Sequence, residues 1–283
     1  MHIAIVGAGF TGLTAAYYLQ KQGHTATIFE KDVKPGGLAM GFQKKGWDWP
    51  LEKHYHHIFT SDNDIRNLAS EIGVSFRFSR PNTSAFIDGQ ILQLDSPLKL
   101  LQFSKLSISE RLRMASVLVY LKYISSWQRI EKYTAHDWLQ KYLGRVPYGT
   151  LWEPLLIGKF GPYYKDISLS WFWARIKART TQLGYPNGGF QHFADILAQK
   201  IVDYGGSIQY QAQVEEIGET FLTVNHQRIQ ADAVLVTVPN RVFMTLAQTL
   251  PGEYTDKLQS FKGIGAVNMI MECDHPFLPD HVY

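Results

Sequence analysis

The sequence predicts an α/β fold: a Rossmann-like βαβ domain carrying an inserted, mainly helical domain and part of a second sheet. The first observation is an apolar run, Ile3–Val6, followed by a glycine turn, Gly7–Gly12, an amphipathic run, Leu13–Gln22, and a second apolar run, Thr25–Phe29. This is the order that a dinucleotide-binding βαβ unit requires. The second observation is a change in character over 96–184, where short helical patterns rich in tryptophan replace strand patterns.

Length and composition are those of an ordinary globular protein. The chain has 283 residues, of which 45% are hydrophobic and 19% charged, and a net charge of +3, which offers no case for a nucleic-acid partner. Its single cysteine, Cys273, excludes an internal disulfide and a thiolate metal cage. No apolar run is long enough to span a bilayer, and the first strand pattern begins too close to Met1 for a signal peptide. We therefore expect a cytoplasmic protein.

The glycine turn predicts a pyrophosphate site. Gly7 allows a tight turn at the strand end, Gly9 lacks a Cβ that would block a phosphate, and Gly12 lets the helix pack closely on the strand. The pyrophosphate is expected at the N-terminus of the helix, where free N–H groups and the helix dipole favour an anion. The predicted contacts are Gly7, Ala8, Gly9, Phe10, Thr11 and Gly12.

An acid ends the second strand. Glu30 lies about twenty residues after the turn, where such a carboxylate accepts hydrogen bonds from ribose hydroxyls. Its negative charge disfavours a 2′-phosphate, and the adjacent Lys31, also a candidate cofactor contact, does not reverse that preference. The ligand is therefore expected to be FAD or NAD rather than NADP.

A Pro-Gly-Gly turn follows, where a plain NAD enzyme has a second crossover helix. Ile3–Ala39 resembles the N-terminus of the flavin-containing amine oxidase superfamily, which includes protoporphyrinogen oxidases and phytoene-desaturase-like enzymes, with UDP-galactopyranose mutases as relatives. The resemblance implies FAD. In that family an Arg-x-Gly-Gly-Arg element lies along the pyrophosphate. Here Lys34 replaces the first arginine, Gly36 and Gly37 are retained, and Leu38, before Ala39, replaces the second.

Three histidines occur in four positions. His54 and His56 would share one face of a strand and His57 the other, and only Glu52 is spaced to join them, so no metal site is predicted. His57-Ile58-Phe59 is similar to an element beside the isoalloxazine of the mutase relatives, which implies that His57 contacts the flavin. The alternative is that these histidines have packing and surface roles.

The central part begins with a helix over 61–72, capped by Gly73, and strands over 74–94 around an Asp88-Gly89 turn. Thr134–Asp137 then resembles a capping box. In the flavin family a helical insertion at this place forms a lid over the reactive face of the flavin. Core positions are expected for most of the tryptophans of the block: Trp127, Trp138, Trp152, Trp171 and Trp173.

The segment 98–123 has two interpretations. It is rich in Leu, Val and Tyr, and only Glu110 offsets its cations, which are Lys99, Lys105, Arg111, Arg113 and Lys122. It is suited to a membrane interface, which would make the protein peripheral to the membrane and admit an apolar substrate. The alternative, which we favour from sequence alone, is a buried helix pair with a solvated basic edge.

Gly184–Gly189 marks the return to the first domain. The patterns that follow predict helices at Phe190–Tyr204 and Asn240–Gln248, strands at Ser207–Tyr210, Ala212–Ile217 and Phe221–Val224, and a buried parallel strand at Ala231–Val238. The resemblance implies that the residue matching Val214 meets the adenine through its backbone amide and carbonyl.

The expected domains are 1–75 with 186–250, which bind FAD, and 76–185 with 251–283, which contact a small-molecule substrate. Ala266–Met271 is predicted to be a strand of the substrate-domain sheet; Lys262 before it is given no role. The last glycine-rich segment of the family has no counterpart, which suggests a fragment or a shortened protein. Such a chain is expected to bind FAD weakly and to self-associate.

The resemblance implies an FAD-dependent oxidoreductase that oxidises a C–N or C–C bond of a small apolar or amine substrate by hydride transfer to flavin N5. The sequence identifies no catalytic residue, substrate, electron acceptor or oligomeric state. Two alternatives stay open: an isomerase of the UDP-galactopyranose mutase kind, and a flavin-binding fragment without turnover.

Overall fold

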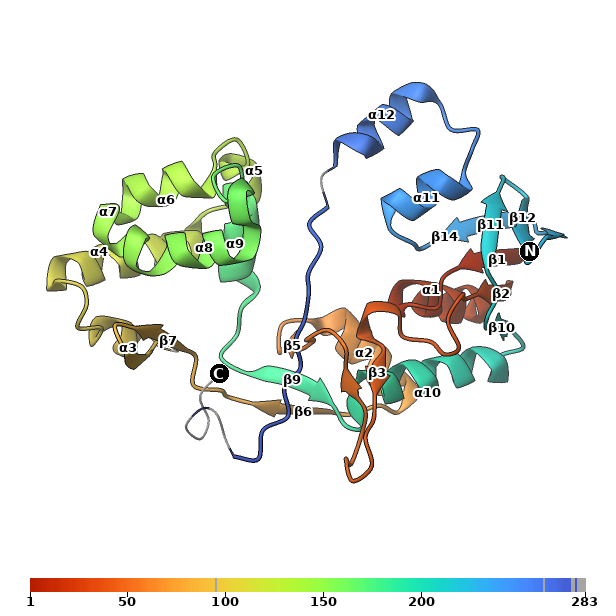
Figure 1. The fold of residues 1–283 in the computed structure, drawn as a ribbon, viewed down its shortest axis with the longest axis horizontal. Coiled ribbons are helices and arrows are strands. Elements are labelled where there is room, and N and C mark those ends of the chain that lie inside the picture. The colour runs from red at the N-terminus through yellow and green to blue at the C-terminus, as the bar shows by residue number, and fades with distance from the viewer. Residues whose placement is uncertain (95, 262, 276–277, 279–283) are drawn as a thin grey trace. The chain divides into compact units, whose positions relative to one another are not determined.

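The computed structural model describes residues 1–94, 96–261, 263–275 and 278 (Figure 1). The chain divides into two compact units. The first unit consists of Met1–His57, Asp64–Arg77 and Tyr185–Ile270, and the second of Ile58–Asn63, Phe78–Gly184 and the described part of Met271–Tyr283. The sequence division differs chiefly in two places, because 58–63 cluster with the second unit and 251–270 with the first.

A four-stranded parallel sheet forms the centre of the first unit. Its order is β10 (Ser207–Gln209), β2 (Thr25–Phe29), β1 (His2–Val6) and β14 (Ala233–Val236). Helix α1 (Phe10–Lys21) connects β1 to β2, which confirms the predicted βαβ unit. The predicted strand near β14 is parallel, but it is not fully buried, since it lies at the edge of the sheet and Leu235 is exposed.

Alternate residues of β1 face two different cores. Ile3 and Ile5 pack with α1, α2 (Asn63–Ile72) and α10 (Gly189–Asp203). Ala4 and Val6 pack with the opposite layer, which comprises the sheet β11-β12-β13 and helix α11. The bounds of that layer are β11 (Val214–Ile217), β12 (Phe221–Val224), β13 (Gln227–Gln230) and α11 (Asn240–Leu246). The first unit therefore has three layers, and β13 is a strand that the sequence analysis did not predict.

The second unit is mainly helical, as predicted. Its helices are α3 (Pro97–Leu101), α4 (Ile108–Val119), α5 (Trp127–Ile130), α6 (Ala135–Leu143), α7 (Arg145–Pro147), α8 (Glu153–Phe160) and α9 (Leu169–Ala178). They enclose one core, whose fully buried side chains include Met114, Leu139 and Tyr148. Trp127 is exposed, whereas the other tryptophans of this block pack in or against the core. In the described part of the chain, no helix is long and apolar enough to cross a membrane.

Short strands accompany the helical block. β5 (Ile58–Phe59), β9 (Leu183–Pro186) and β6 (Phe76–Ser79) form one small sheet, and β7 (Ser84–Ile87) and β8 (Gln90–Gln93) form the predicted hairpin. The Asp88-Gly89 turn has positive φ at both residues, 50° and 75°, as a tight hairpin turn requires.

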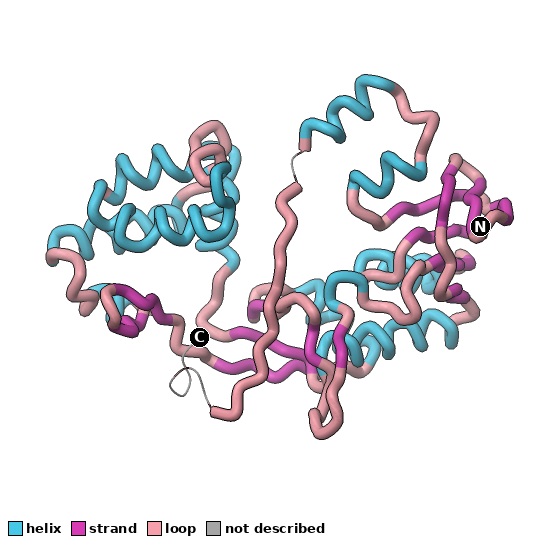
Figure 2. The backbone as a smooth tube through the Cα atoms, in the orientation of Figure 1, coloured by secondary structure: helices cyan, strands magenta, loops and turns pink. Residues whose placement is uncertain are grey.

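The predicted strand Ala266–Met271 is wrong. Beyond α12 (Gly252–Ser260), the described residues 263–275 contain no strand, and this stretch is drawn as loop in Figure 2. Asn268 donates through Nδ2 to the Lys53 carbonyl at 3.2 Å, while Val267 is 99% exposed. An apolar pattern produces a strand only where a neighbouring strand supplies hydrogen bonds, and none of the described strands pairs with this stretch. Lys262 lies outside the described residues.

Candidate functional site

Gly12 is required by the packing of the glycine turn itself. Gly7 ends β1 with φ of 101°, and its N–H donates to the Phe29 carbonyl at 2.9 Å. A Cβ added at Gly12 would lie 2.0 Å from the Gly7 carbonyl oxygen, a backbone atom that cannot move aside. Helix α1 can therefore approach β1 this closely only with glycine at position 12.

Gly9 differs from Gly12, because its missing Cβ faces open space. A Cβ there would meet a single atom within 4 Å, the Gly37 Cα at 3.9 Å. Gly9 is the N-cap of α1, with no side-chain cap and no acidic residue in the first turn of the helix. An uncapped helix N-terminus facing a space that a Cβ would fill suits an anion. The neighbouring Phe10 packs edge-on against Phe193, with ring centroids 5.0 Å apart.

The Gly36–Gly37 loop lies against this turn. Gly36 donates its N–H to the Ala8 carbonyl at 2.9 Å and has φ of 126°, while Gly37 has φ of 56°. A Cβ at Gly37 would come within 3.0 Å of the Gly9 Cα, so two glycine backbones form the walls of one cradle. The structure thus brings together two motifs that the sequence analysis assigned to one cofactor.

The side chains next to the Gly36–Gly37 loop differ in their partners and in their exposure to solvent. Lys34 donates from Nζ to the Gly41 carbonyl at 2.6 Å. Leu38, at the position of the second family arginine, is 74% exposed, and Ala39 is buried. Lys31 is exposed. Because a carbonyl partner leaves the Lys34 charge uncompensated, Lys34 remains available to an anion.

Glu30 is held in place by backbone amides on both sides. Its side chain is 6% exposed; Oε2 accepts the Ala8 N–H at 2.7 Å, and Oε1 accepts the Asp32 N–H at 2.9 Å. Each carboxylate oxygen can accept a second hydrogen bond. The carboxylate is therefore fixed beside the glycine turn with acceptor capacity left for a hydroxyl pair.

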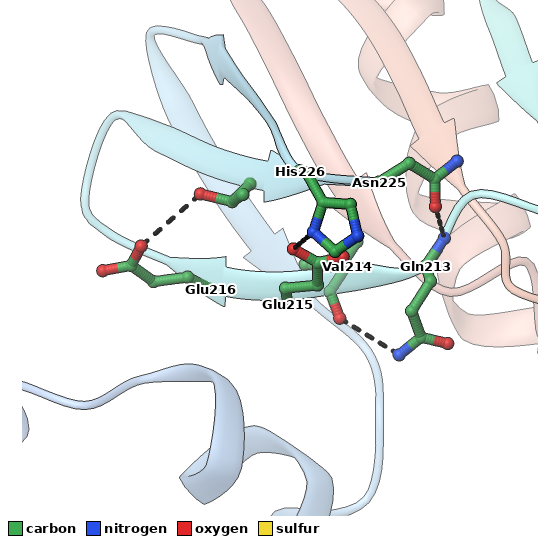
Figure 3. Close-up of polar contacts among 7 residues, drawn as sticks. Gln213, Val214, Glu215, Glu216, Asn225 and His226 are labelled. Atoms are coloured by element: carbon green, nitrogen blue, oxygen red, sulfur yellow. Dashed lines mark hydrogen bonds and ion pairs between the residues drawn. The ribbon is translucent and has the colours of Figure 1, made fainter.

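Backbone pairing brings Val214 close to this acid. The Ala212 N–H donates to the Glu30 carbonyl at 2.9 Å, and the Gln211 N–H donates to the Asp32 carbonyl at 3.1 Å. Further along the chain, the Gln213 side chain donates from Nε2 to the Val214 carbonyl at 3.2 Å (Figure 3). The side chain of Val214 is buried, so only its backbone could read a ligand.

The three histidines do not lie on a strand. Residues 53–57 are a loop between β4 (Leu51–Glu52) and β5, so His54 and His56 share no strand face. His54 accepts at Nδ1 from Asn268 at 2.8 Å, whereas His56 donates from Nδ1 to the His54 carbonyl at 2.6 Å. The His57 ring lies 5.1 Å from that of Tyr55. Among the described residues, no group of three or more metal-ligating side chains is assembled.

Gln191 is a positioning residue that the sequence analysis missed. Its side chain is 3% exposed; Oε1 accepts the Gly41 N–H at 3.0 Å, and Nε2 donates to the Pro35 carbonyl at 2.9 Å and to Asp195 at 2.8 Å. These bonds fix both ends of the glycine loop to α10. In the sequence, the only sign of this role is a glutamine next to the apolar face of the predicted helix Phe190–Tyr204.

Glu52 was considered only as a metal ligand, and it has another role. It is 4% exposed; Oε1 accepts the Phe190 N–H at 2.8 Å, and Oε2 accepts the Tyr185 hydroxyl at 2.5 Å. Phe190 is in the first turn of α10, whose N-cap, Gly188, makes no side-chain bond, so Glu52 caps this helix from a distant strand. Burial, followed by the bond to Glu52, raises the pKa of the Tyr185 hydroxyl, so it stays protonated at neutral pH.

Comparison with known families decides the assignment. The profile of the family described as flavin containing amine oxidoreductase matches residues 10–282. The chain belongs to this family. Proteins of this family contain a flavin, which agrees with the resemblance of Ile3–Ala39.

The relatives of this flavin-family chain include several oxidases. Coproporphyrinogen III oxidase of Staphylococcus aureus is 25% identical over 289 residues, covering 86% of this chain and 61% of the relative. Mitochondrial protoporphyrinogen oxidase of Nicotiana tabacum is 26% identical over 165 residues, covering 56% of this chain and 32% of the relative. The chain thus spans less than two thirds of the length of these relatives.

Solved structures show the same fold. Cyclohexylamine oxidase from Brevibacterium oxydans is similar with a TM-score of 0.71 and 17% identity, covering 91% of this chain and 62% of that structure. Reduced UDP-galactopyranose mutase is similar with a TM-score of 0.69 and 16% identity, covering 91% of this chain and 59% of that structure. At these identities the likeness concerns the fold alone.

Proposed function

We propose that this flavin-family chain binds FAD in its first unit and acts as an oxidoreductase on a C–N or C–C bond of a small apolar or amine substrate. The observation that carries the proposal is the glycine cradle: Gly9, which lies against the Gly37 backbone, leaves a space at the uncapped N-terminus of α1 that a side chain would fill. The arrangement fits a pyrophosphate, and Glu30 lies beside it with free acceptor capacity.

Each part of the cradle has a distinct role in this proposal. The N-terminus of α1 and the Lys34 ammonium offset the charge of the pyrophosphate. The Glu30 carboxylate accepts the ribose hydroxyls, and its two amide bonds hold it in position before a ligand arrives. The backbone of Val214 serves the adenine once the Gln213 carboxamide leaves the Val214 carbonyl.

When bound, FAD supplies the ring that accepts a hydride, which is the difficult chemistry of such a reaction. The contribution of the chain is then to bind and orient. Gln191 and Glu52 secure α10 against the glycine loop and β4, so the cradle keeps its shape. We assign no catalytic residue in this chain.

The experiment is flavin retention by Gly9→Val. A Cβ at position 9 meets only the Gly37 Cα, at the ordinary contact distance of 3.9 Å, yet a branched side chain there occupies the space proposed for the pyrophosphate. The purified variant should therefore lack the absorption of oxidised flavin while keeping the urea unfolding midpoint of the flavin-free parent protein, since bound flavin would itself raise that midpoint. Gly158→Val is the matched control, because Gly158 also has open space around it but lies in α8 of the second unit.

Full flavin occupancy in Gly9→Val would show that the site has been misplaced. A parent protein that stays colourless after incubation with FAD would overturn the proposal itself. Tight binding of a UDP-sugar by the reduced protein would favour the isomerase alternative over oxidation.

A further inference from the structure

Helix α4 is apolar on two opposite sides. Its inner side carries Met114, which is fully buried, and continues to the buried Leu121 in the π-helical turn Tyr120–Ile124. Its outer side carries Ile108, Leu112, Ala115 and Val119, whose spacing of four, three and four residues places them on one face of a helix. Ile108, Leu112 and Val119 are 72%, 56% and 51% exposed.

The segments on either side of α4 extend this apolar surface. Arg111 donates to the Leu101 and Leu106 carbonyls at 2.8 and 2.7 Å, which ties α3 to the start of α4. We call the exposed apolar side chains of 98–127 the outer face: Leu98, Leu101, Ile108, Leu112, Val119, Tyr123, Ile124 and Trp127. A soluble helix normally directs its apolar stripe only inward, so this second stripe requires a separate explanation.

Two cations beside the outer face donate to backbone carbonyls. Arg113 donates to the Tyr142 and Lys141 carbonyls at 2.6 and 2.8 Å, and Lys122 donates to the Arg179 carbonyl at 2.8 Å. Carbonyls are neutral, so these bonds fix the cations without compensating them. These cations are therefore held in place beside an exposed apolar face.

Three cations gather where α4 ends. Lys177 donates to the Lys122 carbonyl at 2.9 Å, and Lys122 donates to the Arg179 carbonyl at the end of α9. Hydrogen bonds in both directions therefore join the two segments. Burial, followed by the charges of Lys177 and Arg179, lowers the pKa of Lys122. The charges at this end are therefore close enough to repel one another, and an anion would relieve that repulsion.

We propose that the outer face is a contact site for the surface of an anionic lipid bilayer. Its apolar side chains would enter the boundary of the acyl chains, Tyr123 and Trp127 suit the headgroup level, and the exposed Lys177 beside Lys122 would meet anionic headgroups. A second copy of the chain is disfavoured, because it would bring two uncompensated cation clusters together. This inference does not depend on the proposed flavin chemistry.

The test is co-sedimentation of the full chain with vesicles. The parent protein should pellet with phosphatidylcholine vesicles that contain phosphatidylglycerol, and salt should weaken binding. The double variant Leu112→Asp/Val119→Asp should bind at least tenfold more weakly, since it removes two apolar groups and adds two negative charges. Leu155→Asp/Ile157→Asp is the matched control, with two exposed residues of α8, and it should bind like the parent.

A second variant tests the role of charge. Lys177→Gln removes one cation of the cluster and should weaken binding to the anionic vesicles about fivefold, without changing the weak binding to pure phosphatidylcholine. Equal binding of the Leu112→Asp/Val119→Asp variant and the parent would overturn the proposal. So would a parent protein that ignores both vesicle types, or one that pellets without vesicles through self-association.

Discussion

Glu30 and Glu52 are both buried carboxylates, and they perform different tasks in the first unit. Glu30 accepts two backbone amides that lie within 22 residues of it, at Ala8 and Asp32. Glu52 accepts the Tyr185 hydroxyl and the Phe190 amide, which lie 133 and 138 residues away. Both carboxylates provide acceptors for donors that would otherwise be buried without a hydrogen bond. Glu30 keeps acceptor capacity beside the glycine cradle, while Glu52 joins the start of α10 to β4.

The difference teaches what local pattern can and cannot reveal. Glu30 follows a strand at a fixed distance from a glycine turn, so its position in the sequence indicates its role. The partners of Glu52 come from a part of the chain that returns only after the whole helical block. Mutation can test whether the proposed binding role of Glu30 and the structural role of Glu52 are separate.

The largest effect is expected for Glu52→Ala. The substitution leaves the buried Phe190 N–H and the Tyr185 hydroxyl without their acceptor and removes the cap of α10. We expect a loss of about 2–4 kcal/mol in the free energy of unfolding, measured by urea denaturation of the flavin-free protein.

Glu52→Gln is the informative companion, because its amide oxygen can still accept one of the two bonds and most of the stability should return. If Glu52→Ala unfolds at the urea midpoint of the parent, the long-range cap carries no stability, and the contrast with Glu30 fails.

The next largest effect is expected for Glu30→Ala, and it should appear as a loss of FAD affinity. Loss of charge-assisted acceptors should weaken FAD binding by about 1–3 kcal/mol, measured by flavin titration. Glu52→Gln, which keeps an acceptor at the other acid, should titrate like the parent. An equal loss of affinity in both variants would mean that the two acids act together in binding.

How much of the fold follows from sequence depends on whether the signals are local. The βαβ unit, the Asp88-Gly89 hairpin and the capping residue Thr134, which accepts the Asp137 N–H at 3.1 Å, all agree with their local patterns. Each is decided by neighbouring residues through turn geometry, hydrophobic period or helix capping.

The errors arise where distant partners decide the outcome. Ala266–Met271 has a strand pattern but no described neighbouring strand, and the histidine loop is shaped by Asn268 and Phe190, more than 130 residues away. Gln191 is polar, and only the fold reveals that it holds the glycine loop. In the second unit, composition predicted helices correctly, yet it left open whether the segment 98–123 is buried or exposes an apolar face, as α4 does.

A smaller effect is expected for Tyr185→Phe, which sharpens the role of Glu52. The variant keeps the aromatic packing against Phe190 and removes only the hydroxyl donor, so we expect a loss of about 1 kcal/mol. The pKa of Tyr185 is raised in the fold, so its contribution is complete below the ordinary tyrosine pKa of about 10 and declines as pH rises above it. The difference between parent and variant should therefore be the same at pH 7 and pH 9; a difference that grows with pH would contradict this assignment.

The smallest effect is expected for Lys34→Ala, and it tests whether the cradle beside Glu30 needs a side-chain cation. The ammonium already donates to the Gly41 carbonyl, and Leu38 provides no charge nearby. If the pyrophosphate rests mainly on the N-terminus of α1, losing Lys34 should cost FAD affinity less than about 1 kcal/mol. Because salt screens a partly exposed charge, the loss should be larger at low ionic strength and should shrink as salt is added. Lys257→Ala is the control, since Lys257 is an exposed lysine of α12 to which no cofactor contact is assigned. Flavin titrations over a range of salt decide the matter: parallel curves for parent and Lys34→Ala would show that this lysine serves only the Gly41 carbonyl, and that backbone amides hold the phosphates.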